Sequence, residues 1–259
     1  MIRLGALLAI LSAGLAQDGP KFEVASIKPS DPNYQGSMMR TTAGGRVEMR
    51  GFTLKDMIIN AWQVRDFQVV GGPNWIDSDR FDLEAKPDRP TQPREMSAML
   101  RALLEDRCKL VVREETKEAP IYELVLARRD GKLGPEMKET TCQVYDKDHP
   151  QPSPTPGQPP RGCGGMSTRS GQMMVSGMPI VNLGMYLSGM LDREVVDRTG
   201  LTGRYDFTLK WTPENRRADD NAGPSIFTAL QEQLGLKLES AKGPVEMLIV
   251  EHAEKPSEN

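Results

Sequence analysis

The residues with the clearest chemical potential lie in the segment Val195–Trp211, where Arg198, Arg204 and Tyr205 surround a glycine-marked turn. Guanidinium groups and a phenol can hold an anion or another polar ligand. Backbone amides in a glycine-rich turn can face an anion as well. One interpretation is therefore a recognition loop in which these three side chains bind a ligand.

The same segment also has the composition of a structural connection between two strands. Gly200 and Gly203 permit the positive φ angles of a tight turn. Asp197 can accept hydrogen bonds from the turn amides, and Arg204 can pair with its carboxylate. We favour this structural interpretation for Asp197, Gly200 and Gly203, and keep ligand binding by the neighbouring side chains as the alternative.

The chain lacks the common catalytic and metal-binding signatures. It contains no G-x-S-x-G, H-E-x-x-H, P-loop or paired C-x-x-C motif. Its two histidines, His149 and His252, are far apart and have no obvious third ligand for zinc. Most of its 15 methionines fall on predicted core faces rather than in a soft-metal site. We therefore assign no catalytic residue, no metal and no cofactor, and a pair of carboxylates for glycoside hydrolysis remains the enzymatic alternative.

The charge balance excludes two classes of partner. With 33 basic and 36 acidic residues the net charge is −3, and neither sign forms a long run. A nucleic-acid-binding protein usually carries a basic face, and a peripheral membrane anchor usually carries a polybasic segment. We expect neither activity.

The first sixteen residues have the pattern of a signal peptide. Arg3 precedes an uncharged, mostly apolar run over Leu4–Leu15, and Gly14 and Ala16 are small residues where a signal peptidase reads. The pattern predicts cleavage before Gln17. No later stretch is long and apolar enough for a membrane span. We expect an exported protein, periplasmic or secreted, with no transmembrane segment after cleavage.

Two of the three cysteines bracket a proline-rich loop predicted over residues 141–164. A disulfide between Cys142 and Cys163 would close that loop and stabilise the fold by about 3 kcal/mol. Export permits such oxidation, so we favour the bond over free thiols. Cys108 lies between a predicted helix and a strand, where a small buried apolar residue is expected.

Repeated patterns on either side of this loop predict an internal duplication. Gly45–Gly51 and Gly171–Gly177 match in length and glycine placement, and Tyr205–Leu209 echoes Phe81–Ala85. Each match is followed or preceded by an amphipathic helix; the first begins at Thr53 with a capping-box pattern. A repeat of about 120 residues is too long for a solenoid and fits a duplicated domain.

The predicted fold class is therefore α+β, in two related lobes over residues 17–140 and 165–259. Each lobe is expected to run strand, helix, strand, strand, helix, strand, strand, with helices packed on mostly antiparallel sheets. The last two strands are expected to be separated by turns, at Ala119-Pro120 in the first lobe and Gly243-Pro244 in the second.

Several motifs together resemble a known family. The segments Phe22–Pro29, Val196–Phe207 and Gln233–Glu239 and the ending Glu254–Asn259 resemble the soil-associated uncharacterised protein family expanded in acidobacteria. The resemblance covers essentially the whole mature chain and implies an exported bacterial protein of unknown function. Similar domains attached to membrane metallopeptidases of the antibiotic-sensor type suggest extracytoplasmic sensing or binding. Each strand–helix–strand unit also resembles, more loosely, the short N-terminal domain of secretins and TonB-dependent receptors.

Together these features predict a non-enzymatic binding, interaction or sensing module of the cell envelope. Its partner would be another envelope protein or a small ligand. The alternatives are a secreted carboxylate-dependent hydrolase acting on a cell-wall or polysaccharide substrate, and a purely structural envelope protein.

Overall fold

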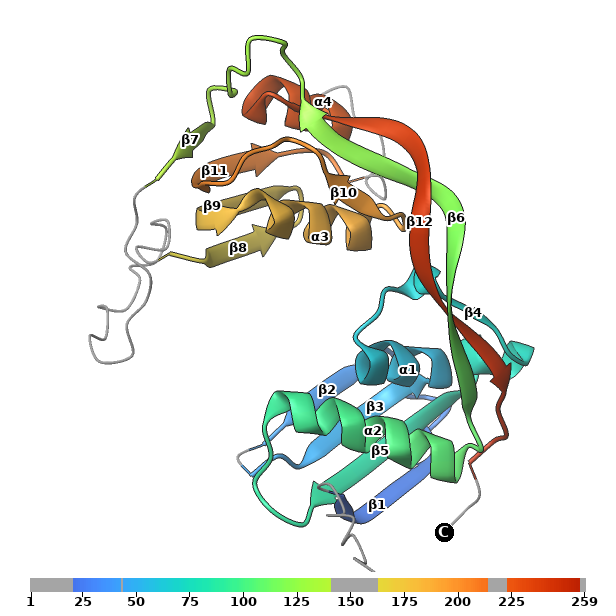
Figure 1. Ribbon diagram of the computed structural model, residues 1–259. Coiled ribbons are helices and arrows are strands. Elements are labelled where there is room, and N and C mark those ends of the chain that lie inside the picture. Colours follow the sequence, from blue (N-terminus) through green and yellow to red (C-terminus); the bar gives the residue numbers. More distant parts are fainter. Residues whose placement is uncertain (1–20, 43, 141–162, 214–222, 257–259) are drawn as a thin grey trace, which may run out of the picture. The chain divides into compact units, whose positions relative to one another are not determined.

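The computed structural model describes residues 21–42, 44–140, 163–213 and 223–256, which form two compact units (Figure 1). The first unit draws its residues from Met1–Val64, Gly71–Val112 and Val250–Asn259. The second draws its residues from Arg65–Val70 and Arg113–Ile249. The mixture of helices and mostly antiparallel sheets in the described part of the chain confirms the α+β class.

The first unit is built on an antiparallel sheet with the strand order β1-β5-β3-β2. Its strands are β1 (Phe22–Pro29), β2 (Met38–Thr41), β3 (Val47–Thr53) and β5 (Arg80–Pro87). Helices α1 (Leu54–Trp62) and α2 (Pro93–Arg107) pack against each other and against this sheet (Figure 1). Alternate residues of β5, namely Phe81, Leu83 and Ala85, are buried, as a strand with one face on the core requires.

Helix α1 begins as its sequence predicts. The Thr53 hydroxyl accepts a hydrogen bond from the Asp56 amide at 3.1 Å, and the Asp56 carboxylate accepts one from the Thr53 amide at 3.0 Å. This reciprocal capping box satisfies two amides that have no partner within the helix. The predicted start of the helix is confirmed.

The second unit contains an antiparallel sheet with the order β7-β11-β9-β8. Its strands are β7 (Met137–Glu139), β8 (Gly165–Arg169), β9 (Gln172–Pro179) and β11 (Arg204–Lys210). Helix α3 (Ile180–Met190) follows β9, and helix α4 (Ile226–Ala229) continues into a π-helical turn over Leu230–Leu234. Their apolar residues form one buried cluster with β9 and β11.

A third sheet has the order β10-β6-β12-β4. It consists of β10 (Val195–Asp197), β6 (Val111–Leu126), β12 (Leu236–His252) and β4 (Val69–Gly71). Two short 3-10 helices, Asp66–Gln68 and Asn74–Asp77, flank β4. The strand β10 pairs with β6 in parallel, from Val195 opposite Tyr122 to Asp197 opposite Leu124.

The predicted order of elements within each lobe differs from the structure. The strands β1 and β2 precede β3 where the predicted order has one strand before the helix, although the alternation over residues 22–27 does predict β1. The predicted turns at Ala119-Pro120 and Gly243-Pro244 are wrong, because β6 and β12 run through them uninterrupted. Tyr122 donates its amide to Glu194, on the β10 side of β6. The backbone nitrogens of a strand point alternately to its two edges, so the nitrogen of Pro120 points to the same edge of β6 as that of Tyr122. Pro120 lies just before the pairing of β6 with β10 begins. Its missing N–H therefore breaks no ladder bond with β10.

The two four-stranded sheets share one connectivity. Placing β7, β8, β9 and β11 where β1, β2, β3 and β5 stand converts the order β1-β5-β3-β2 into β7-β11-β9-β8. In both sheets a helix follows directly on the third of these strands, α1 after β3 and α3 after β9. Shared connectivity is what a duplication would leave, although descent from one ancestor stays a prediction.

Some predictions concern residues outside the described part of the chain. These are the signal peptide over residues 1–16, most of the loop over residues 141–164, and Cys142, so the Cys142–Cys163 disulfide also stays a prediction. Cys108 is described and is fully buried. Among the described residues, no helix combines the length and the apolar character needed to cross a membrane.

Candidate functional site

The turn after β10 is organised by the carboxylate of Asp197. Its Oδ1 accepts hydrogen bonds from the amide of Thr199 at 2.9 Å and from the Thr199 hydroxyl at 2.8 Å. The Thr199 Oγ1 in turn accepts from the Leu201 amide at 3.1 Å, and only 7% of Thr199 is exposed. Gly200 adopts a φ of +71° with open space around it. Asp197 therefore closes the turn on itself, in the manner of an Asx turn.

Helix α3 holds this turn in place through a buried serine. The Ser188 hydroxyl donates to the carbonyl of Gly184 at 2.9 Å and accepts from the Val195 amide at 2.9 Å. A Cβ on Gly184 would lie 3.3 Å from the Val195 carbonyl oxygen. A glycine in mid-helix usually costs about 1 kcal/mol of helix stability. Here it allows the backbone of β10 to pack directly on the helix.

The three residues predicted to bind a ligand have different environments. The Arg198 guanidinium is 62% exposed, and its Nε lies 3.5 Å from Glu123 Oε1. Arg204 Nη1 instead donates to the carbonyl of Gly177 at 2.9 Å. Tyr205 is only 4% exposed, and burial, reinforced by the Glu139 carboxylate and opposed by a hydrogen bond with the Gly203 backbone, raises its pKa. Their role in ligand binding stays a prediction.

Gly203 allows β11 to start close to its neighbour. A Cβ on Gly203 would lie 2.5 Å from Glu139 Oε1 and 3.1 Å from the Tyr205 hydroxyl. The predicted pairing of Asp197 with Arg204 is not among the contacts of these residues, because Asp197 bonds to Thr199 whereas Arg204 bonds to Gly177. Each side chain therefore braces a different stretch of backbone.

Arg204 belongs to a contact that we call the glycine clamp of the second unit. Gly177 in β9 has a φ of +62° and lies where the β9–β11 register shifts. Its amide donates to Asp206 Oδ1 at 2.8 Å, and its carbonyl accepts from Arg204. Glycine is favoured at such a bulge because its φ is positive. The arginine and the aspartate thus hold the bulge through the two peptide groups that flank one glycine.

The first unit contains the corresponding clamp around Gly51. Gly51 has a φ of +69°, donates to Asp82 Oδ1 at 3.0 Å and accepts from Arg80 Nη1 at 2.7 Å. Asp82 Oδ1 also accepts from the Ser30 hydroxyl at 2.6 Å. The register of β3 and β5 shifts at this point as well. In both clamps the arginine stands two residues before the aspartate, and a helix begins three residues after the glycine.

A pocket of about 410 Å³ adjoins the clamp arginine of the first unit, and we call it the Tyr34 pocket. Apolar side chains form much of its wall, namely those of Pro29, Pro32, Tyr34 and Phe81. Phe81 occupies the place in β5 that Tyr205 occupies in β11, so the sequence echo marks this position in both units. Tyr34, Asp79 and Lys255, which complete the pocket, were missed because three distant segments supply them.

An ion pair lies at the edge of the Tyr34 pocket. Lys255 Nζ is 2.6 Å from Asp79 Oδ2, and the lysine side chain is 62% exposed. The hydrogen bond from Lys255 holds the pKa of Asp79 below its ordinary value, so this carboxyl is ionised at neutral pH. The amide of Glu254 donates to the Cys108 carbonyl at 2.7 Å and fixes the chain next to Lys255. The pocket thus combines apolar walls with two acidic residues, Asp31 and Asp79, and two basic residues, Arg80 and Lys255.

A second carboxyl group with a shifted pKa lies in the second unit. Partial burial raises the pKa of Glu194, the Arg65 guanidinium opposes the rise, and Glu246 adds to it. Arg65 Nη2 also donates to the carbonyl of Met185 in α3 at 2.9 Å. Within the described residues, no group of three or more His, Cys, Asp or Glu side chains is placed to hold a metal ion.

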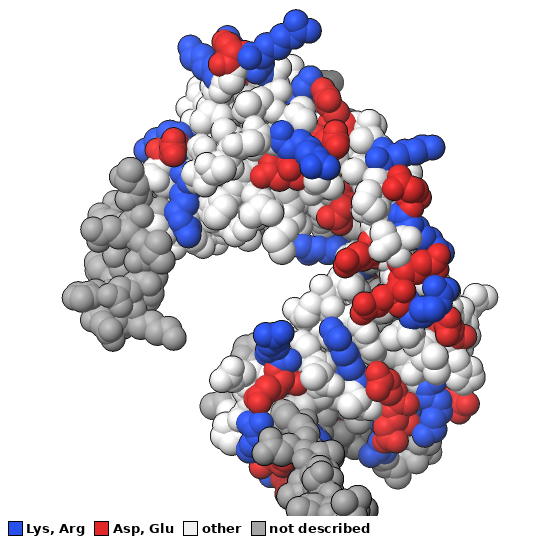
Figure 2. All heavy atoms as spheres, in the orientation of Figure 1, with Lys and Arg blue, Asp and Glu red and all other residues white. Residues whose placement is uncertain are grey.

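Charges of both signs are interspersed on the face of the molecule shown in Figure 2. Among the described residues, exposed charges also form ion pairs, such as Arg46 with Glu84 and Lys237 with Glu239. A face of this kind offers no extended basic area for a phosphate backbone.

Comparison with known proteins places the chain in a family without assigning an activity. No curated protein and no solved structure matches the chain. A family model described as "Protein of unknown function (DUF3738)" matches residues 55–253. This range includes the whole clamp of the second unit, and Arg80 and Asp82 but not Gly51 of the first. The chain therefore belongs to the DUF3738 family of proteins of unknown function.

Proposed function

We propose that this protein is an exported, non-enzymatic binding module of the bacterial cell envelope, and that the Tyr34 pocket binds a small amphipathic ligand. The observation that carries the proposal is the pocket itself, with its apolar wall and its Asp79–Lys255 ion pair. Ligand sites combine mostly apolar walls with a few placed polar groups. A ligand with a carboxylate or an ammonium group beside an apolar moiety fits both features.

The proposal of export rests on the sequence. The apolar run ahead of Gln17 supports a cleaved signal peptide, and Cys142 and Cys163 support a disulfide in an oxidising compartment. The resemblance to the soil-bacterial family and to sensor-associated domains points to periplasmic or secreted binding or sensing. Mass spectrometry of the protein recovered from its native host tests this part, since an N-terminus at Met1 would contradict export.

We also propose that the two units arose by duplication. The support is the shared strand order and the two glycine clamps, in which Arg80, Asp82 and Gly51 correspond to Arg204, Asp206 and Gly177. The Tyr34 pocket lies beside the clamp of the first unit. The first copy would thus bind the ligand, and the second copy would contain the turn that Asp197 organises.

Calorimetry after a thermal-shift screen of cell-wall fragments tests the Tyr34 pocket. We expect a fragment that binds the wild type to lose at least tenfold in affinity in Lys255→Met and in Tyr34→Ala. Lys237→Met is the matched control, because Lys237 also forms an exposed 2.6 Å ion pair, with Glu239, but does not line the pocket. Equal losses in Lys255→Met and Lys237→Met would contradict the assignment. If no fragment bound and the protein instead captured another protein from envelope extract, the proposed small ligand would be wrong and a protein partner would take its place.

One observation favours a second function, a secreted carboxylate-dependent hydrolase of a cell-wall or polysaccharide substrate. Partial burial and the neighbouring Glu246 raise the pKa of Glu194, and a carboxyl group with a raised pKa is what the general acid of such hydrolysis requires. Release of reducing ends from peptidoglycan or polysaccharide that disappears in Glu194→Gln would support this function. The absence of any such release by the wild type would exclude it for those substrates.

A further inference from the structure

We propose that a second pocket of the first unit binds a neutral small molecule that carries amide and hydroxyl groups, such as an N-acetylated amino sugar. The pocket has a volume of about 310 Å³ and lies between β2, the end of α1 and the start of α2. This volume is at the lower end of the range of about 300–1,000 Å³ seen for ligand sites. We call it the amide pocket, and it is separate from the Tyr34 pocket.

Six of the ten described residues that line the amide pocket have uncharged polar side chains. The polar members are three carboxamides and three hydroxyls, from Asn60, Gln63, Gln92, Thr41, Thr91 and Ser97. None of the described residues that line it is ionisable. An ion would lose its hydration there without gaining an opposite charge, which is costly. The lining therefore selects a neutral ligand.

The Thr91 hydroxyl is a polar group that lacks a partner. Its Oγ1 is buried, and it has no hydrogen bond within the described part of the chain. A Cβ on Gly45 would lie 2.4 Å from this oxygen, so the glycine, with a φ of +88°, makes room for it. Buried hydroxyls are nearly always paired, and an exception calls for an explanation. A ligand hydroxyl or amide in the adjoining pocket would supply the missing partner once the Thr91 side chain rotates toward it.

Two of the carboxamides that line the pocket are held through their nitrogens. Asn60 Nδ2 donates to the Asp56 carbonyl at 2.8 Å, and Gln63 Nε2 donates to the Asn60 carbonyl at 2.5 Å. These bonds use the amide nitrogens and orient the side chains. The carboxamide oxygens remain as acceptors, which suits the N–H of an acetamido group or a sugar hydroxyl.

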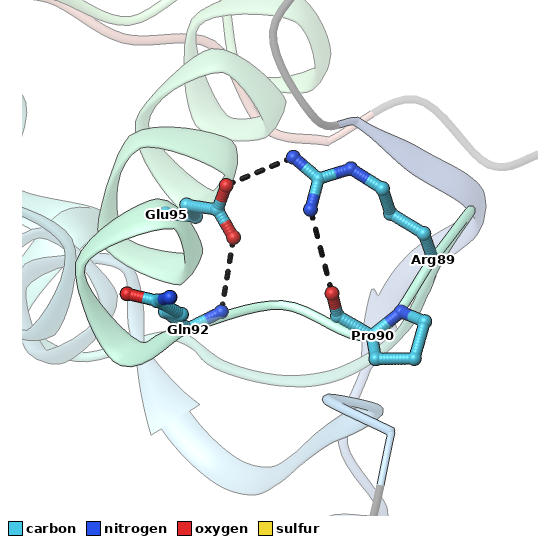
Figure 3. Close-up of polar contacts among 4 residues, drawn as sticks. All are labelled: Arg89, Pro90, Gln92 and Glu95. Atoms are coloured by element: carbon cyan, nitrogen blue, oxygen red, sulfur yellow. Dashed lines mark hydrogen bonds and ion pairs between the residues drawn. The ribbon is translucent and has the colours of Figure 1, made fainter.

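Arg89 and Glu95, which flank the lining residues Thr91 and Gln92 in the sequence, form an ion pair. Arg89 Nη2 donates to Glu95 Oε1 at 2.8 Å, and the Gln92 amide donates to Glu95 Oε2 at 3.0 Å (Figure 3). The Glu95 carboxylate is therefore committed to Arg89 and to the backbone at the start of α2.

An apolar wall completes the recognition. Met96 and Leu100 are buried in α2, whereas Met39 in β2 is 42% exposed. Thioether side chains are flexible and adapt to irregular apolar surfaces. An acetyl methyl group or the C–H face of a sugar ring would cover this wall.

Isothermal titration calorimetry with N-acetylglucosamine as the probe tests the proposal. We expect the wild type to bind it, and to bind glucosamine, which carries an ammonium group, at least tenfold more weakly. Thr91→Val keeps the shape of the side chain and removes the hydroxyl, so the affinity should fall about five- to tenfold, the effect of one hydrogen bond. In the absence of ligand this variant should melt no lower than the wild type, because the lost hydroxyl was unpaired.

A matched pair of substitutions on α2 locates the binding site. Ser97→Met fills the pocket and should abolish binding, whereas Ala98→Met adds the same side chain at the exposed neighbouring position and should not. Lys255→Met should leave the affinity for N-acetylglucosamine unchanged, so failure here and failure of the Tyr34 pocket are distinguishable. Absence of N-acetylglucosamine binding by the wild type, or equal binding by Ser97→Met and Ala98→Met, would overturn the proposal.

Discussion

Removing the carboxylate from each glycine clamp should destabilise the two units unequally. Asp82 Oδ1 accepts two hydrogen bonds, from the Gly51 amide at 3.0 Å and from the Ser30 hydroxyl at 2.6 Å, whereas Asp206 Oδ1 accepts one, from the Gly177 amide at 2.8 Å. A hydrogen bond to a charged group contributes about 1.5–3 kcal/mol, and these are only partly buried, so we use the lower end. Asp206→Ala should then cost about 1.5–2 kcal/mol and Asp82→Ala about 3–4 kcal/mol.

Urea denaturation followed by tryptophan fluorescence measures both losses. Trp62 and Trp75 belong to the first unit and Trp211 to the second, so single-tryptophan backgrounds report each unit separately. Asp82→Asn and Asp206→Asn serve as controls, because the carboxamide oxygen can still accept the glycine amide. We expect each Asn variant to lose less than half as much stability as its Ala counterpart.

Three results would refute the reasoning about the clamps. Equal losses in Asp82→Ala and Asp206→Ala would show that the Ser30 hydrogen bond contributes nothing. Equal losses in the Ala and Asn variants would show that the acceptor oxygen is not what stabilises the bulge. A loss of stability that Asp82→Ala produced only in the signal of Trp211, or that Asp206→Ala produced only in the signals of Trp62 and Trp75, would contradict the local role of the clamp.

Three further predictions follow from the described contacts. A double-mutant cycle of Asp197→Ala and Arg204→Ala should be additive to within about 0.5 kcal/mol in urea denaturation, because the two side chains bond to different backbone groups; coupling above that level would reveal a direct pair. Because the pKa of Glu194 is raised in the folded protein, wild-type stability should fall as the pH rises from its ordinary value of 4.5 through the raised value. Glu194→Gln should lack that fall and be the more stable at pH 7, and an unchanged slope between pH 4 and pH 8 would contradict this. Burial raises the pKa of Cys108 to about 11, so a thiol reagent at pH 8 should not label it in the native state. Labelling after denaturation without reductant should find one thiol if the predicted Cys142–Cys163 disulfide is present and three if it is absent.

The elements that the sequence predicted well are those with local causes. Thr53 and Asp56 stand three residues apart and form their capping box within one turn of helix. The alternation of Phe81, Leu83 and Ala85 needs only the period of a strand. The matching glycines and aspartates of the two halves were visible for the same reason, because a bulge and its clamp recur at a fixed spacing.

The long strands were mispredicted because their continuity depends on partners. Proline and glycine are local signals for a turn, and both occur near the middle of these strands. Gly243 instead allows close packing, since a Cβ there would lie 2.7 Å from Ile121 Cδ1. Pro120 is tolerated because its ring faces a side of β6 where pairing with β10 has not begun. Neither fact can be read from a window of neighbouring residues.

The pockets show the same limit for function. The motif with the most chemical promise, around Arg204 and Tyr205, was found from spacing alone, yet both side chains are committed to the backbone or buried. The Tyr34 pocket joins a loop, the start of β5 and the residue Lys255 near the end of the described chain. No spacing rule connects these three segments.

By itself, the sequence determined the α+β class, the helix starts, the glycine positions and the echo between the two halves, because each depends on backbone conformation and side-chain period over a few residues. The tertiary structure alone decided how far β6 and β12 extend, which arginine braces which peptide, and which side chains meet in the two pockets. Those features depend on groups brought together from distant parts of the chain, where hydrogen-bond satisfaction and close packing are settled only once the chain has folded.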